Sequence, residues 1–391
     1  MSTDRRPAVH DASVEAARIG IIVNPIAGIG GLLALHGSDQ ELAAKAIGLG
    51  AQPHATERMV SALVSLRRDA KGPLEVVAGE GTMGEDAARQ AGLTVVSVLP
   101  RATAGMRTSA ADTRLAAESA AKHPVDLLLF AGGDGTATDV AAAVGDATPV
   151  LGVPSGVKMH SGVFAIDPER AGRIAANFLA SAPPRSTRTA EVLDVVGDDG
   201  VRPIGHVVTP RSAGIQNPKA MSRGSDGAVV ALGHELANAM EPGRLYLIGP
   251  GMSAGTVLDA LSLNGSVSGV DAVIDGRLVA RDATERELLD LVSTHAGACL
   301  VLGVVGGQGF LLGRGNQQIS SRVLEHIEPD DVIIIAAHDK IAALTPPVLH
   351  VDMGADAEEL TVQGYRTVRT SPTRSVVMRV GIDHRERGLA S

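Results

Sequence analysis

Short apolar runs alternate with helical patterns over the first 155 residues, and this alternation constrains the fold more than any other feature. Five runs are expected to be strands: residues 18–23, 74–78, 94–99, 125–130 and 149–153. Residues 38–41 and 109–112 resemble capping boxes, which open helices. Strands that alternate with helices predict a parallel sheet covered by helices. We therefore expect a doubly wound, Rossmann-like α/β domain that binds ligands beyond the carboxyl ends of its strands.

The alternation weakens after residue 160. Helix-start and turn signals stand at Asp167-Pro168, Pro183-Pro184, Asp275-Gly276 and residues 284–287. Asp275-Gly276 lies between two apolar runs, which is typical of a tight hairpin. Residues 299–305 and 331–336 are strand-like. These patterns predict a second domain that is richer in strands.

The predicted organisation has four parts. A flexible tail covers residues 1–17, and the α/β domain covers residues 18–160. The β-rich domain is expected over residues 161–350. Residues 351–391 form a C-terminal segment that could pack back on the first domain, and its charged end is expected to be a solvated tail.

Composition excludes several functional classes. The formal charge of −9 argues against a broad phosphate-binding surface for duplex DNA, and 4 Phe with 2 Tyr leave little material for stacking on single strands. No apolar run approaches the roughly 20 residues of a membrane helix, and residues 1–18 lack the apolar stretch of a signal peptide. Cys299, the single cysteine, cannot form an internal disulfide and is expected to be a small buried hydrophobe. We expect a cytoplasmic protein without nucleic-acid or membrane partners.

The strongest local signal is the sequence Gly132-Gly133-Asp134-Gly135-Thr136, which follows an apolar run and precedes a helical pattern. Glycines let phosphate oxygens approach backbone N–H groups, and a helix N-terminus carries partial positive charge. Asp134 would repel a phosphate at contact. Its carboxylate suits a general base or orienter for a hydroxyl that attacks a phosphoryl group, or a position near Mg²⁺. The alternative is that Asp134 only caps the helix.

This motif resembles the hallmark of the NAD kinase and diacylglycerol kinase superfamily. Residues 22–31, 152–161 and 306–320 are similar to the ATP-NAD kinase-like subfamily that includes the acetoin-catabolism X proteins. The resemblance implies a nucleotide-binding α/β domain, a β-rich domain for substrate and oligomerisation, and an active site between them. It implies that Asp134 activates the acceptor hydroxyl while Gly132, Gly133, Gly135 and Thr136 meet phosphates. It also suggests ATP as donor and a homodimer or homotetramer.

Two other blocks are candidate phosphate sites. The loop after the first expected strand contains Asn24, Pro25, Gly28, Gly30 and Gly31. Its backbone amides and the Asn24 side-chain amide could hold phosphates or ribose. The alternative is that the loop is only a flexible turn. After the fifth strand, Ser155 and Lys158 lie in a loop where the lysine could neutralise a phosphate. An ordinary surface lysine is the alternative.

In residues 306–320, Arg314 is the one guanidinium among several glycines. A guanidinium can clamp a phosphate with two N–H groups, and Asn316, Gln317 and Gln318 are hydrogen-bonding neighbours. The alternative is that this stretch only makes structural turns.

Residues 249–256 occupy the place of a substrate loop in NAD kinases, with Gly251, Ser253, Gly255 and Thr256 as candidate contacts. The same stretch contains Gly-x-Ser-x-Gly between a strand and a helix, as in a hydrolase nucleophile elbow. A later Asp275 or Asp331 and a later His338 or His350 could complete a triad. A serine hydrolase is therefore the rival enzyme class.

The identity of the acceptor hydroxyl comes from the resemblance alone. The resemblance suggests NAD, phosphorylated at the adenosine ribose 2′-hydroxyl, but the Asn-Glu or Asn-Asp pair of NAD kinases is absent from the sequence. Another small hydroxylated metabolite and a non-catalytic nucleotide sensor stay open. No HExxH motif occurs, so we expect no protein-built metal site and Mg²⁺ held through phosphates. With so few aromatic residues, the adenine is expected to rest on aliphatic side chains and backbone.

Overall fold

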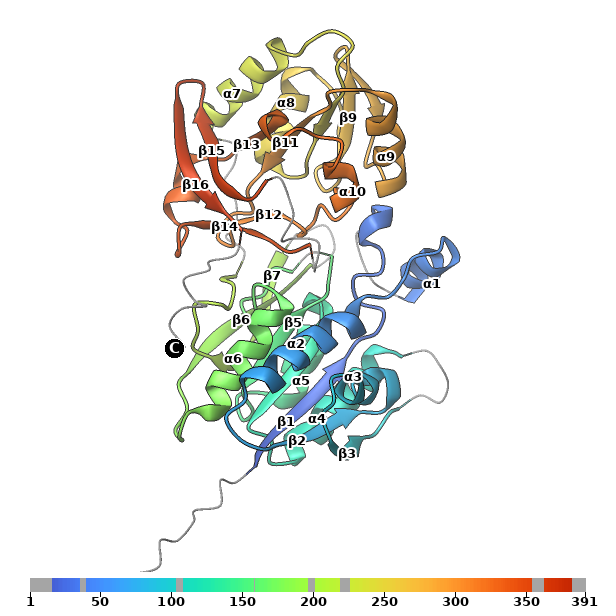
Figure 1. Cartoon of the computed structure of the whole chain (residues 1–391), viewed down its shortest axis with the longest axis vertical. Coiled ribbons are helices and arrows are strands. Elements are labelled where there is room, and N and C mark those ends of the chain that lie inside the picture. The colour runs from blue at the N-terminus through green and yellow to red at the C-terminus, as the bar shows by residue number, and fades with distance from the viewer. Residues whose placement is uncertain are drawn as a thin grey trace, which may run out of the picture.

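The computed structural model describes residues 16–35, 40–102, 108–157, 159–195, 201–218, 226–353 and 362–381. These residues form two bodies that are stacked along the long axis of the molecule (Figure 1). The first body contains the elements from β1 to β7, and the second contains those from α7 to β16.

The first body is built on a five-stranded parallel sheet in the order β3-β2-β1-β4-β5. Its strands are β1 (Ala17–Val23), β2 (Leu74–Gly79), β3 (Val95–Leu99), β4 (Leu127–Gly132) and β5 (Val150–Pro154). All five expected strands are confirmed, with ends shifted by at most two residues. Every residue of β4 and β5 is buried, as expected for apolar strands covered on both faces.

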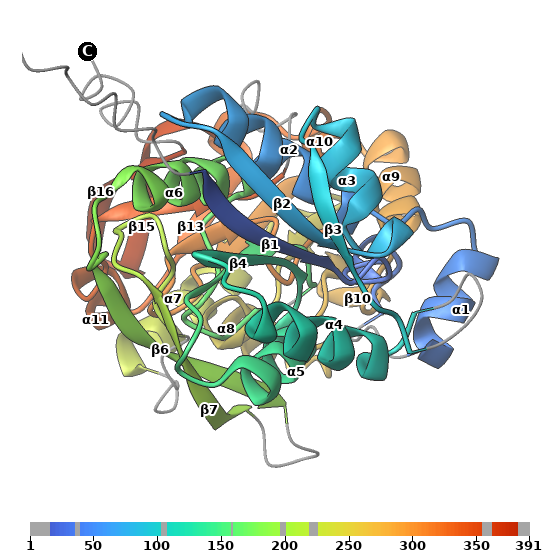
Figure 2. The ribbon, with the colours of Figure 1, turned by 90° about the horizontal axis from the view of Figure 1, so that it is seen from below.

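Helices cover both faces of this sheet (Figure 2). One face packs on α2 (Ala55–Asp69), α3 (Glu85–Gln90) and α6 (Pro168–Ala180). The other packs on α4 (Ala110–Lys122) and α5 (Asp134–Val144). The doubly wound arrangement is therefore confirmed.

Side chains cap several helices as expected. Ser109 forms a capping box with Asp112 at α4, and Asp167 caps α6 with Pro168 in its first turn. Thr284 forms a capping box with Glu287 at α9 (Glu285–Thr294). The box expected at residues 38–41 falls largely outside the described residues, and α1 (Gln40–Gly48) begins beside it.

The first body extends beyond the domain boundary expected at residue 160. Helix α6 packs on α2, and the hairpin of β6 (Thr187–Val195) and β7 (Val201–Pro210) contacts the face that carries α5. Val192 and Val207 of this hairpin share a hydrophobic cluster with Phe130. Since their apolar side chains complete the core of the first sheet, these elements belong to the first body. The change of pattern at residue 160 marks a change of element type.

The second body contains a nine-stranded mixed sheet in the order β10-β9-β8-β11-β13-β15-β16-β14-β12. Its strands are β8 (Tyr246–Ile248), β9 (Asp271–Ile274), β10 (Arg277–Ala280), β11 (Cys299–Gly303), β12 (Phe310–Leu312), β13 (Val332–Ile335), β14 (Val348–Val351), β15 (Gly364–Ser371) and β16 (Arg374–Val380). Its helices are α7 (Gly227–Asn238), α8 (Met252–Ala260), α9, α10 (Ser321–Leu324) and α11 (His338–Ala342). The β-rich second domain is confirmed, and so are the buried Cys299 and the hairpin turn at Asp275-Gly276.

The described residues after 353 belong to the second sheet, and Asp352 contacts the first body through Arg58. Strands β15 and β16 lie between β13 and β14 in the second sheet, because Val368, Met378 and Val380 complete its core. Residues 354–361 and 382–391, including the expected charged tail, lie outside the described residues, as do residues 1–15 of the expected N-terminal tail.

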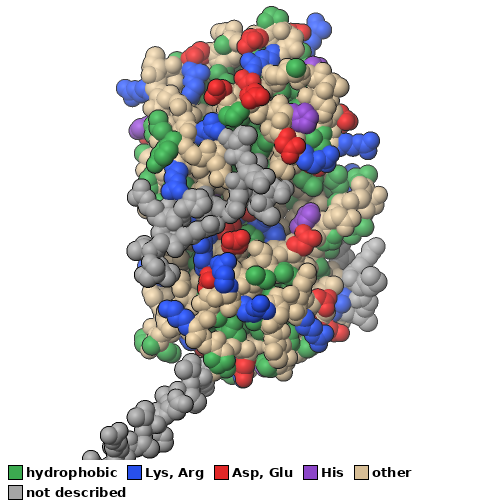
Figure 3. Space-filling model, viewed as in Figure 1, with side chains coloured by type: hydrophobic (Ala, Val, Ile, Leu, Met, Phe, Trp, Pro, Cys, Tyr) green, Lys and Arg blue, Asp and Glu red, His purple; other side chains and the backbone are tan. Residues whose placement is uncertain are grey.

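No helix in the described ranges is long and apolar enough to cross a membrane. On the face of the molecule in Figure 3, basic and acidic side chains are interspersed over both bodies.

Candidate functional site

Three loops meet at the carboxyl edge of the first sheet, where the sequence placed the phosphate sites. The Asn24 amide nitrogen, after β1, donates to the hydroxyl of Thr136, after β4, at 3.0 Å. A Cβ atom on Gly28 would lie 2.0 Å from the carbonyl oxygen of Ser155, after β5. A Cβ atom on Gly133 would lie 3.2 Å from the Cα atom of Gly156. The glycines of three separate blocks therefore let these loops pack directly on one another.

Gly135 differs from the other glycines of its motif. It is exposed in the first turn of α5, and a Cβ atom there would meet no atom within 4 Å. A Cβ atom on Gly132 would instead lie 2.4 Å from the Thr136 side chain. Gly135 thus leaves room beside the N-terminus of an eleven-residue helix, where a phosphate is stabilised by backbone N–H groups.

Asp134 is the first residue of α5, and its carboxylate faces residues 160–161. Its Oδ2 atom accepts from the backbone N–H of His160 at 2.7 Å. Its Oδ1 atom accepts from the backbone N–H and the hydroxyl of Ser161 at 3.0 and 2.6 Å. The imidazole Nδ1 of His160 lies 3.0 Å from Oδ2. The N-cap residue of α5 is Gly133, so Asp134 does not occupy the capping position.

A cavity of about 750 Å³ lies between the two bodies. Gly28 and Ser155 line it from the first body, and Gly313 and Gln317 line it from the second. Its volume is in the range of nucleotide-sized sites. Its large apolar lining residues are aliphatic, namely Leu32, Ile319, Val351 and Met353.

Three arginines line this cavity: Arg58 from α2, Arg173 from α6 and Arg322 from α10. Within the described ranges, Arg173 and Arg322 form no ion pair, so their charges are available to an anion. Arg58 is paired with Asp352 at 2.5 Å. The lining also contains Glu57, Glu169 and Glu285, so the cavity is of mixed charge.

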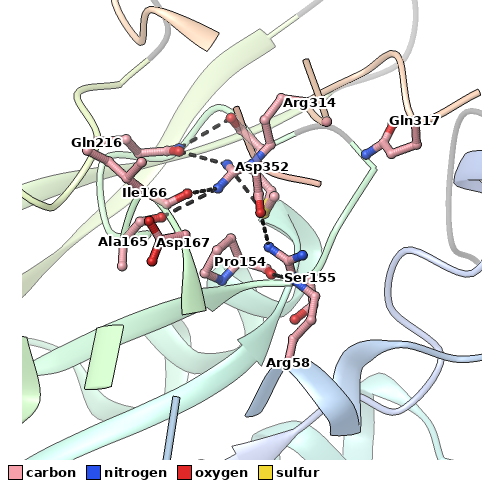
Figure 4. A network of polar contacts seen from close by, with 12 residues as sticks. Arg58, Pro154, Ser155, Ala165, Ile166, Asp167, Gln216, Arg314, Gln317 and Asp352 are labelled. Atoms are coloured by element: carbon pink, nitrogen blue, oxygen red, sulfur yellow. Dashed lines mark hydrogen bonds and ion pairs between the residues drawn. The ribbon is translucent and has the colours of Figure 1, made fainter. Parts of the chain in front are cut away.

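Arg314 is buried, does not line the cavity, and is held by several protein contacts (Figure 4). Its Nε atom donates to Asp352 at 2.7 Å, and Nη1 donates to Gln216 at 2.9 Å and contacts the Met159 sulfur. Nη2 donates to the carbonyl oxygens of Ala165 and Ile166. A guanidinium has five N–H groups, and each has a partner here. This geometry favours the structural alternative for Arg314 over a phosphate clamp.

The neighbours of Arg314 divide between a structural and a site-facing role. Asn316 accepts from the N–H of Gly313 and donates to the carbonyl of Leu311, which closes the turn. Gln317 lines the cavity and donates to the carbonyl of Val157 at 2.7 Å, while its Oε1 atom has no partner in the described part of the chain. Gln317 is thus the residue of this block that remains a substrate-contact candidate.

The substrate loop expected at residues 251–256 begins α8 in the second body and does not line the cavity. The hydroxyl of Ser253 lies 3.4 Å from Nζ of Lys340. Asp331 pairs with Arg244, and His350 packs on Phe310. Among the described contacts of Ser253 there is neither a histidine nor an aspartate, so the hydrolase triad is not assembled.

Lys158 lies outside the described residues. No cluster of three or more His, Cys, Asp or Glu side chains that could hold a metal ion occurs in the described part of the chain. Four residues at this site were not predicted from the sequence: Arg58, Arg173, Arg322 and Asp352. An arginine in an amphipathic helix is normally a solvated side chain, so its sequence position gives no functional signal. Only the fold brings residues 58 and 352 into contact.

Two family models match this chain. The model of the ATP-NAD kinase N-terminal domain matches residues 19–182, and that of the ATP-NAD kinase C-terminal domain matches residues 243–380. The chain belongs to the ATP-NAD kinase family. It is therefore a phosphotransferase with an alcohol group as acceptor, of a family that uses ATP and a divalent metal ion. The N-terminal match ends beyond residue 160, in agreement with α6 as part of the first body. No curated protein and no solved structure matches the chain.

Proposed function

We propose that this kinase transfers the γ-phosphoryl group of ATP to the 2′-hydroxyl of the adenosine ribose of NAD. The observation that carries the proposal is the position of Asp134 beside the open N-terminus of α5, at the edge where three loops meet an interdomain cavity. The phosphoryl donor binds at an edge that offers backbone N–H groups, and the carboxylate lies where a hydroxyl needs a proton acceptor.

In this mechanism the ribose oxygen attacks the γ-phosphorus, and the bond from that phosphorus to the β-phosphate oxygen breaks. The hydroxyl proton passes to the carboxylate of Asp134. ADP leaves. Asp134 does not line the cavity, whereas Ser155 and Gly156 do, and its carboxylate is bonded to His160 and Ser161. The proposal therefore requires that the carboxylate becomes accessible to the acceptor hydroxyl when substrates bind.

The residues present fit a nucleotide better than a protein-built metal site. The cavity has aliphatic residues for a base and two arginines without ion pairs in the described ranges for phosphates. With no acidic or histidine cluster in those ranges, we propose that Mg²⁺ is held mainly by the phosphates of ATP, where it neutralises developing charge.

The test is phosphoryl transfer from γ-labelled ATP with Mg²⁺ to a panel of NAD, NADH, nucleosides, diacylglycerol and small polyols. We expect label in NADP. Asp134→Asn should lower kcat by a factor of about 10² to 10⁴ and leave binding of ATP intact. Asp139→Asn, on the same helix but paired with Arg114, is the matched control and should retain activity.

Other outcomes would replace the proposal. Label in a different acceptor would identify a kinase of another hydroxylated metabolite. Equal binding of ATP by wild type and Asp134→Asn, with no transfer to any acceptor, would indicate a nucleotide sensor. Light scattering on the eluting protein would test the expected homo-oligomer.

A further inference from the structure

Arg58 offers an unused donor nitrogen to the interdomain cavity. Its Nε atom donates to the carbonyl oxygen of Pro154, and its Nη2 atom donates to Oδ1 of Asp352 at 2.5 Å. The Nη1 atom has no hydrogen-bond partner in the described part of the chain. The side chain lines the cavity and is 20% exposed. Two of the three guanidinium nitrogens are therefore held by the protein, on a side chain that lines the cavity.

Asp352 is held from both bodies of the molecule. Arg58 of the first body binds Oδ1, and Arg314 of the second body binds Oδ2 at 2.7 Å. Burial would raise the pKa of Asp352, but Arg58 and Arg314 together lower it, so the carboxylate is ionised. Its side chain is 3% exposed. Arg314 is itself fixed by five contacts, so Asp352 is a rigid anchor for the Arg58 guanidinium (Figure 4).

The guanidinium of Arg58 lies beside the loops predicted to bind phosphates. Its partner Pro154 precedes Ser155, whose carbonyl oxygen would overlap a Cβ atom on Gly28. Ser155 and Gly28 line the same cavity as Arg58. A phosphate at this edge would meet backbone N–H groups from one side and a preoriented cation from the other. Preorientation matters because a free arginine loses side-chain entropy when it binds.

We propose that Arg58 binds a phosphoanhydride group of a nucleotide through Nη1, and that Asp352 is the positioning residue for Arg58. This inference rests on the proposed function, since it names the cation of the same interdomain site. The phosphoanhydride can come from ATP or from the pyrophosphate of NAD.

Calorimetric titration of the full chain with Mg-ATP, NAD and adenosine tests the contact. We expect Arg58→Gln to weaken binding of the contacted nucleotide by about tenfold to a hundredfold, and binding of adenosine by less than about twofold. The nucleotide that loses affinity identifies the source of the phosphoanhydride. Arg58→Lys should recover part of the loss, because it keeps the charge without the fork.

Arg67→Gln is the matched control, because Arg67 is on the same helix but donates to the carbonyl of Ala91. It should leave all three affinities unchanged. The inference is wrong if Arg58→Gln leaves the ATP and NAD affinities unchanged, or if it lowers the adenosine affinity as much as the nucleotide affinities. Arg58 would then only stabilise the contact between the two bodies.

A double-mutant cycle tests the role of Asp352. Asp352→Asn should weaken nucleotide binding relative to adenosine in the wild-type background. In the Arg58→Gln background, Asp352→Asn should change the ratio of nucleotide affinity to adenosine affinity by less than about twofold, because the two residues act through one contact. Equal effects in both backgrounds would refute the positioning role.

The titrations need no turnover, so Arg58-dependent binding without phosphoryl transfer would refute only the proposed function. Transfer to NAD with Arg58-independent binding would refute only this inference.

Discussion

At the scale of residues, the glycines of the candidate site serve two different purposes. Gly28 has a φ of +74°, and a side chain there would overlap the carbonyl of Ser155. Gly135 has free space around it and lies in the first turn of α5. The first glycine is needed for loop packing. At Gly135 the protein itself leaves room for a side chain, so a side chain there would clash only with a bound ligand.

Paired alanine substitutions should separate these purposes. Gly28→Ala should lower the free energy of unfolding by about 1–3 kcal/mol, because alanine is strained at this positive φ and its Cβ atom would overlap the Ser155 carbonyl oxygen. Gly135→Ala should leave it unchanged or raise it by about 0.5–1 kcal/mol, because alanine favours the helix. If phosphates approach α5, Gly135→Ala should also weaken binding of Mg-ATP. Urea denaturation and calorimetric titration measure the two effects, and unchanged ATP affinity in Gly135→Ala would place the phosphates elsewhere.

A second prediction at this scale concerns pH. Burial, with Arg170 and Arg314 nearby, lowers the pKa of His350 from 6.5 to about 4. In the unfolded chain the imidazole binds a proton below pH 6.5, whereas in the folded protein it stays neutral down to about pH 4. His350 therefore contributes stability above pH 6.5 that is lost as pH falls toward 4, by about 3 kcal/mol in total.

Replacement of His350 by leucine should remove this contribution to the pH dependence. We expect the loss of unfolding free energy between pH 7 and pH 4.5 to be smaller in His350→Leu than in wild type. His234→Leu, at an exposed position on α7, should show the wild-type pH dependence. Urea denaturation at the two pH values measures this loss. An equal loss of unfolding free energy in His350→Leu and in wild type would contradict the shifted pKa.

At the scale of elements, Ser161 connects the start of α5 to β6. Its hydroxyl donates to Asp134, and it accepts from the N–H of Leu193 at 2.9 Å. The side chain is fully buried, so Ser161→Ala leaves the Leu193 N–H without a partner and should lower the free energy of unfolding by about 1–3 kcal/mol. Ser181→Ala, at an exposed hydroxyl that bonds Asn177, should cost less than about 0.5 kcal/mol. Equal costs in denaturation experiments would argue against the buried bond.

The elements were more predictable from sequence than the side-chain contacts between them. The five strands of the first sheet and the caps at Ser109 and Thr284 depend on local apolar patterns and on residues three positions apart. The Arg58–Asp352 pair joins residues 294 positions apart, and no local pattern encodes such a contact. For Arg314, the glycine-rich surroundings suggested a ligand, whereas tertiary packing supplies the five partners. The second body begins later than expected, because α6 and the β6–β7 hairpin complete the first core.

At the scale of the whole molecule, Arg314 couples the stability of the two bodies. Its guanidinium belongs to the second body but donates to the carbonyls of Ala165 and Ile166 in the first. Arg314→Met would leave these carbonyls and the Oε1 atom of Gln216 without the donor that they share, and Asp352 would keep only Arg58 as an ion-pair partner. We expect a loss of about 3–5 kcal/mol in the free energy of unfolding.

Hydrogen exchange followed by mass spectrometry tests whether this loss reaches both bodies. In Arg314→Met, peptides that contain β5 of the first body and β12 of the second should both exchange faster than in wild type, because the bonds of Arg314 to Ala165 and Ile166 of the first body are gone. Arg277→Met, at an exposed position on β10, should leave both exchange rates unchanged. Faster exchange confined to β12 would mean that Arg314 stabilises only its own body. The two bodies would then be joined by the contacts that remain, namely Arg58 with Asp352, Gln308 with Met159 and Gln317 with Val157.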